Sequence, residues 1–86
     1  MDLTLTQQQY DSIRNAKHVP DTVKKVLDAA GVVDGGGRVV RLTYEEATAL
    51  QELCAWNVHS DAAGAVTAAS KVFDDVVTAI LTHPDY

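Results

Sequence analysis

Two strand-to-helix junctions, 37 residues apart, constrain this chain more than any other feature. An alternating apolar stretch ends in Leu5-Thr6 at the first junction and in Leu42-Thr43 at the second. Three residues after each threonine comes a Gln or a Glu, which is the spacing of a capping box. In that motif the threonine hydroxyl and the longer side chain each accept a hydrogen bond from a backbone N–H that the helix start leaves unpaired. The pattern therefore predicts two short strands, each running directly into a helix.

Proline and glycine mark the other boundaries along the chain. Pro20 suits the first turn of a helix, and Gly31 suits the left-handed residue that commonly ends one. The glycine run at 35–37, between two β-prone arms, predicts a hairpin turn, and Pro84 stops the last helix. The expected elements are strands over residues 2–5 and 38–42 and helices over residues 7–17, 21–30, 43–58 and 61–82.

The segment 61–82 carries the longest apolar pattern of the chain. Its apolar residues recur at spacings of 4, 3, 4, 3 and 4, an a/d heptad repeat. We expect a long C-terminal helix that offers more apolar surface than three shorter elements can cover. Phe73, Val76 and Ile80 on this stripe are the residues expected to mediate self-association.

These elements predict an α+β fold that is mostly α, with four helices and a small antiparallel β-ribbon in a single domain of 86 residues. The arrangement is two weakly related β-α-α units, over residues 1–37 and 38–86. The two strands lie antiparallel because the two helices between them reverse the chain an even number of times. A two-stranded ribbon is marginal alone, so it must pack on the helices. Good capping chemistry explains the matched junctions nearly as well as duplication does.

The net charge of the chain is negative, and the charged residues are unevenly distributed along it. The net charge is −5, which argues against nucleic-acid binding, where a basic patch is expected. Residues 1–42 carry +1 and residues 43–86 carry −6, so the acidic half is either a solvated face or a surface for a basic partner. The single cysteine and the absence of a signal peptide or a long apolar run predict a cytoplasmic protein without a membrane span.

No arrangement of chemically active residues predicts an enzyme, a metal site or a cofactor. The three histidines lie at the ends of separate elements, and Cys54 falls on the apolar stripe of its helix, where a free thiol packs as a small hydrophobe. Asp74 and Asp75 are adjacent and diverge by about 100° around a helix. The glycine run is followed by a strand and not by Lys-Ser/Thr and a helix, so a turn is favoured over a phosphate loop.

Trp56 is the candidate binding residue. It lies about 180° around its helix from the core residue Ala47 and aligns with Glu45, Ala49 and Glu52. Tryptophan is enriched at the hot spots of interfaces. Two interpretations remain open: either the last helix or the ribbon covers Trp56 as core, or the ring is an exposed anchor inside an acidic rim that suits a basic protein.

Three functions are compatible with these features, in order of support. The first is a non-catalytic protein–protein interaction module, a homodimer that buries the last helix or the Trp56 face. The second is an acidic inhibitor or antitoxin-like protein that covers a basic surface of an enzyme or nucleic-acid-binding protein, through fast and salt-sensitive association. The third, with the least support, is nucleotide or small-molecule binding at the glycine loop.

Overall fold

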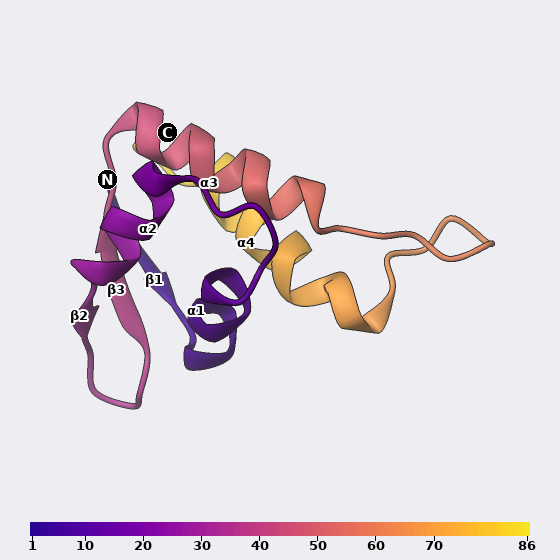
Figure 1. Cartoon of the computed structure of the whole chain (residues 1–86), viewed down its shortest axis with the longest axis horizontal. Coiled ribbons are helices and arrows are strands. Elements are labelled where there is room, and N and C mark those ends of the chain that lie inside the picture. The colour runs from indigo at the N-terminus through magenta and orange to yellow at the C-terminus, as the bar shows by residue number, and fades with distance from the viewer.

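The computed structural model describes residues 1–86 and confirms a mostly helical α+β fold (Figure 1). Four α-helices accompany a small three-stranded antiparallel sheet, and they cover one of its faces. The order of the elements matches two β-α-α units, with one additional short strand between them. The elements are β1 (Asp2–Leu5), α1 (Gln7–Arg14), α2 (Asp21–Asp28), β2 (Gly31–Val32), β3 (Arg38–Arg41), α3 (Tyr44–Trp56), the short 3-10 helix η1 (Ala68–Ser70) and α4 (Lys71–Leu81).

Both predicted capping boxes form. Thr6 Oγ1 accepts from the Gln9 N–H at 3.1 Å, and Gln9 Oε1 accepts from the Thr6 N–H at 2.9 Å. At the second junction Thr43 Oγ1 accepts from the Glu46 N–H at 3.1 Å, and Glu46 Oε1 accepts from the Thr43 N–H at 2.8 Å. Each box satisfies two N–H groups at a helix start, so α1 and α3 begin where the sequence predicts.

The sheet has the order β1-β3-β2, with β3 in the centre. Strands β1 and β3 pair antiparallel, as predicted, with Leu3 opposite Val40. The hairpin at the glycine run adds β2 to the other edge of β3. Gly35 and Gly36 have φ angles of +93° and +90°, and a Cβ on Gly37 would lie 2.8 Å from the backbone oxygen of Leu5. The three glycines thus serve the turn and its close approach to β1.

The core takes residues from the sheet and from all four helices. Leu5, Ile13, Val23, Leu50 and Ile80 are among its most deeply buried side chains. Because successive strand residues alternate sides, Leu3 and Leu5 face the helices while Asp2 and Thr4 face solvent. None of the helices has the length and hydrophobicity that crossing a membrane requires.

The long C-terminal helix is the main prediction that the structure corrects. Helix α4 begins at Lys71, not Asp61, and residues 60–66 instead form a hairpin in which Ser60 bridges to Val66. The Asp61 carboxylate accepts from the N–H groups of Ala63 at 2.9 Å and Ala65 at 3.1 Å. Such local side-chain acceptors compete with helix formation, and Gly64 adopts a φ of +84° that a helix excludes. The heptad spacing does not outweigh these local preferences.

Smaller corrections affect the ends of the other helices. Helix α1 ends at Arg14 and α2 at Asp28, earlier than residues 17 and 30, and α3 ends at Trp56 rather than at residue 58. Gly31 does not close α2, because it already belongs to strand β2. The side chain of Asn57 ends α3 by donating to the Leu53 carbonyl at 2.9 Å. This earlier end directs the chain after Trp56 away from the body of the protein.

Candidate functional site

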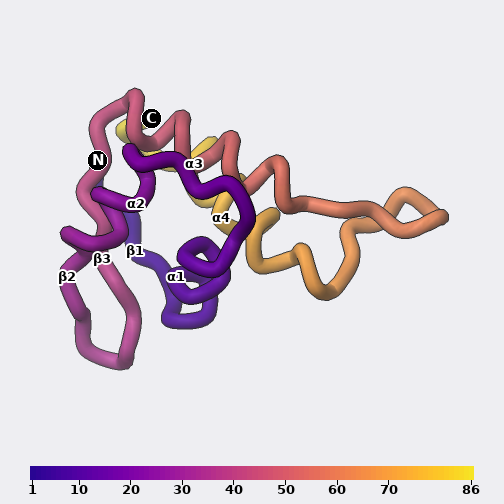
Figure 2. The backbone as a smooth tube through the Cα atoms, in the orientation of Figure 1, coloured from indigo at the N-terminus to yellow at the C-terminus, as the bar shows by residue number.

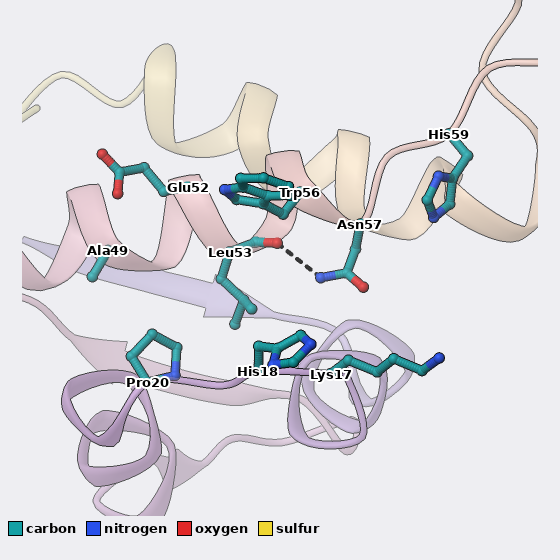
Figure 3. Close-up of a pocket in the computed structure, with 9 residues that line it drawn as sticks. All are labelled: Lys17, His18, Pro20, Ala49, Glu52, Leu53, Trp56, Asn57 and His59. Atoms are coloured by element: carbon teal, nitrogen blue, oxygen red, sulfur yellow. Dashed lines mark hydrogen bonds between the residues drawn. The ribbon is translucent and has the colours of Figure 1, made fainter.

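An open groove runs between α3 and the connection from α1 to α2 (Figure 3). Its volume is about 640 Å³, within the range of roughly 300–1,000 Å³ that is typical of ligand pockets. Helix α3 forms one wall and the α1–α2 connection forms the other. The lining residues are Lys17, His18, Pro20, Ala49, Glu52, Leu53, Trp56, Asn57 and His59.

The α3 wall follows from helical spacing. Ala49, Glu52, Leu53 and Trp56 lie three and four residues apart and share one side of the helix. Leu53 points into the groove and is 5% exposed, so it forms an apolar floor (Figure 3). Glu52 and Trp56 stand on the outer rim. Trp56 is 84% exposed, which decides between the two interpretations of this residue: it is not core.

The opposite wall comes from residues 17–20. His18 has a φ of +61°, a left-handed conformation that is uncommon for a residue other than glycine. The neighbouring Val19 is partly buried and packs against the core, while Lys17, His18 and Pro20 line the groove. The wall is therefore attached to the core by one side chain and presents three others to the groove.

The two walls carry opposite charges. Lys17 lies on the α1–α2 wall and Glu52 on the α3 wall, and neither is in an ion pair within the chain. The ion pairs that do form are Arg41–Asp2 and Lys71–Asp75, and both lie on exposed surfaces away from the groove. The charges of Lys17 and Glu52 are thus free to interact with an occupant.

The structure brings together three of the four residues predicted to bind a partner. Trp56, Glu52 and Ala49 all line the groove, while Glu45 is exposed in the first turn of α3 and does not. Sequence reasoning missed the second wall. Residues 17–20 lie about thirty positions before those of α3, and no spacing rule links the two segments; their proximity comes from the packing of α2 against α3.

The residues expected to mediate self-association lie in or against the core of a single chain. Val76 and Ile80 are 1% and 0% exposed, and Phe73 is partly buried against the same core. The inner face of α4 is therefore already covered within one chain. A second copy could reach these side chains only if α4 left the core, so any self-association must use another surface.

Cys54 and His59 lie in different environments, one buried and the other exposed. Cys54 is fully buried, and burial raises the pKa of its thiol from 9.0 to about 12. A thiol with a raised pKa is a poorer source of the reactive thiolate. His59 is exposed at one end of the groove. No three His, Cys, Asp or Glu side chains gather in positions suited to a metal ion.

Comparisons with protein-family models, with curated proteins and with solved structures find no match for this chain. The groove and the chemistry of its side chains are therefore the basis for assigning a function.

Proposed function

We propose that this protein is a non-catalytic protein–protein interaction module that binds its partner in the groove, with Trp56 as the anchor. The observation that carries this proposal is the 84% exposure of Trp56 at the rim of a groove with an apolar floor. Tryptophan is among the residues that contribute most to binding when an interface buries them, often about 2 kcal/mol or more. An exposed indole beside a groove is thus a surface suited to burial by another chain.

The arrangement of polar and apolar groups supports a protein partner. Specific interfaces combine an apolar centre with a polar rim. In this groove Leu53 on α3 and Pro20 on the opposite wall supply apolar surface, while Lys17 and Glu52 place one charge on each side. The free thiol of Cys54 suits a reducing compartment, and we propose that the module acts in the cytoplasm.

Trp56 also provides the readout for the test, because it is the only tryptophan in the chain. Burial of the indole shifts its fluorescence emission to shorter wavelength. We expect this shift as the protein concentration rises, or on addition of a partner segment, and we expect the Trp56→Ala variant to lose the association in light scattering. Val32→Ala is a matched control, because Val32 is also apolar and exposed, at 73%, but lies on β2.

A second function is favoured by one further observation. Glu45 and Glu52 are exposed on α3 without an ion-pair partner in the chain, in the half of the protein that carries −6. An acidic inhibitor or antitoxin-like protein would use them to cover a basic surface. We then expect an arginine-rich peptide to shift Trp56 emission, with an affinity that falls steeply as salt is added. Binding that is insensitive to salt would count against this function.

A further inference from the structure

The chain between α3 and α4 projects from the body of the protein as an arm (Figure 1). We define the arm as residues 60–66. Besides the bridge between Ser60 and Val66, the Asp61 N–H donates to the Ala65 carbonyl at 2.8 Å, and the Gly64 N–H donates to the Asp61 carbonyl at 3.0 Å. Every residue of the arm is exposed, so the arm contributes nothing to the core.

The base of the arm is held by a buried serine. Ser70 is 2% exposed, and its hydroxyl accepts from the His59 N–H and donates to the His59 carbonyl, each at 3.0 Å. Thr67 Oγ1 lies 2.6 Å from the same hydroxyl, and the Thr67 N–H donates to the His59 carbonyl at 2.9 Å. These hydrogen bonds join the two strands of the hairpin at its root, so the arm leaves the body in a defined direction (Figure 2).

The arm lacks the packing that such a hairpin needs. A two-stranded hairpin is at best marginally stable in water unless a third element or a helix covers it. Here the apolar side chains of the arm face solvent, and Val66 remains 40% exposed. The groove is likewise empty of any side chain that could cover Trp56. One chain therefore presents an apolar arm and an apolar groove, and no other part of the same chain covers either of them.

Position and charge connect the two features. His59 lines the end of the groove and is also the residue that precedes the arm (Figure 3). Asp61 is the only charged residue of the arm, and Lys17 is the only lysine or arginine that lines the groove. Glu52 on the opposite wall would repel Asp61. We therefore expect an arm that lies in the groove to place Asp61 toward the Lys17 wall.

We propose that the arm of one copy lies in the groove of a second copy and the reverse, which forms a two-fold symmetric dimer. This inference rests on the proposed function and names the partner of that site. In a two-fold dimer each contact is reciprocal, so every copy must carry both surfaces, and this chain does. Because groove and arm meet at His59, a two-fold axis beside that residue brings each arm over the other groove. Val66 and the arm alanines then pack against Trp56 and Leu53.

The first experiment measures molar mass in solution against concentration, with the full chain and two variants. Trp56→Ala removes the anchor of the groove, and Val66→Asp places a charge on the apolar side of the arm. We expect each to raise the dissociation constant of the dimer by about tenfold or more. Val32→Asp is the matched control for Val66→Asp, since Val32 is exposed at 73% on β2, and it should leave the dimer unchanged.

A mixture of the two variants tests the reciprocal geometry. Each variant alone retains no complete arm–groove contact, whereas a heterodimer of Trp56→Ala with Val66→Asp retains one. The mixture should therefore form more dimer than either variant alone. A dimer that depends on Trp56 but not on Val66 would overturn the proposal, because it would place the two Trp56 faces directly together.

A wild-type chain that stays monomeric at the highest concentration would also overturn the proposal. The proposed function then has a separate test. If an arginine-rich peptide still shifts Trp56 emission, and Trp56→Ala abolishes its binding, the groove serves a foreign partner and the interaction module stands. If no such shift occurs either, the inference and the acidic-inhibitor function are both wrong.

Discussion

Helix α4 and the arm carry one continuous apolar pattern and fold in opposite ways. Over residues 71–81 the pattern becomes a helix that buries Val76 and Ile80 in the core, while over residues 60–66 it becomes a hairpin exposed along its whole length. The two stretches differ in side-chain size, because the apolar side chains between residues 61 and 70 are alanines apart from Val66. Alanine at a heptad position offers little apolar area to hold a helix against a core. Local hydrogen bonds at Asp61 and the backbone freedom of Gly64 then decide the conformation.

Ser70 lies at the border between these two regions. A serine before a helix commonly caps it, but the Ser70 side chain makes no capping hydrogen bond to α4. Its hydroxyl instead binds His59 and Thr67 at the root of the arm. In this fold the Ser70 hydroxyl bonds to the root of the arm and not to the start of α4.

The largest expected difference between the two regions is in stability. Ile80→Ala removes a fully buried side chain from the α4 side and should lower the free energy of unfolding by about 3 kcal/mol. Val66→Ala on the arm should change it by less than about 0.5 kcal/mol, because the site is exposed. Urea denaturation measures both, at a concentration where the protein is monomeric. Equal effects would mean that the arm packs on the body.

A pH effect is expected from Cys54 on α3, which belongs to the buried core and not to the exposed arm. The pKa of the Cys54 thiol is raised from 9.0 to about 12, so the unfolded chain loses this proton at a lower pH than the folded one. The stabilisation that comes from keeping this thiol protonated is fully present below pH 9. As the pH rises from 9 toward 12, the free energy of unfolding falls by about 1.4 kcal/mol per pH unit at most. Urea denaturation at pH 8 and pH 10.5 should show a steeper loss for the wild type than for Cys54→Ala. Parallel losses would contradict the burial of the thiol.

Removing the Ser70 hydroxyl tests the border itself. Ser70→Ala removes a buried hydroxyl and leaves the half-buried His59 N–H without its acceptor, while the His59 carbonyl keeps the Thr67 N–H, and we expect a loss of about 1 kcal/mol. The arm should also become less ordered, which amide hydrogen exchange at its base measures. Ser60→Ala is the matched control, since Ser60 is exposed and its side chain makes no hydrogen bond within the chain. A stable variant with an ordered arm would show that the hydroxyl is dispensable.

The smallest expected effect is within the arm. Asp61→Ala removes the acceptor for two backbone N–H groups, but both are exposed and can bind water instead. We expect the N–H groups of Ala63 and Ala65 to exchange faster, with a change of less than about 0.5 kcal/mol in global stability. Asp75→Ala, which changes the same charge on α4, should leave their exchange rates unaltered. A helix that extends back from α4 in the Asp61→Ala variant would identify Asp61 as the residue that prevents it.

Elements with a local chemical signature are the ones that sequence reasoning predicted well. The capping boxes at Thr6 and Thr43 place two helix starts at the correct residues. The alternation of Leu3 and Leu5 with polar residues places β1 correctly on the core. Their stabilising contacts lie within a few residues of each other, so the spacing along the chain contains the necessary information. The α3 half of the groove was found for the same reason, from the helical spacing of Ala49, Glu52 and Trp56.

The helix predicted over residues 61–82 failed for two reasons: Asp61 and Gly64 favour a turn locally, and Ser70 binds a segment that lies earlier in the chain. The periodicity of residues 61–82 is a statement about one face of one helix and does not show whether anything packs on that face. The hydroxyl of Ser70 reaches His59, eleven residues earlier, only after the chain has turned back on itself. The heptad interpretation had no means to include that contact.

By itself, the sequence determines where α1 and α3 begin, which faces of their helices and strands are apolar, and that Trp56 stands apart from the core stripe of α3. These properties depend on neighbours within one or two helical turns. Only the tertiary structure decides that Trp56 remains exposed, that Lys17 and His18 face it across a groove, and that residues 60–66 form an arm. The physical reason is that exposure depends on which distant segments pack against a surface, and packing is a property of the whole fold rather than of any spacing along the chain.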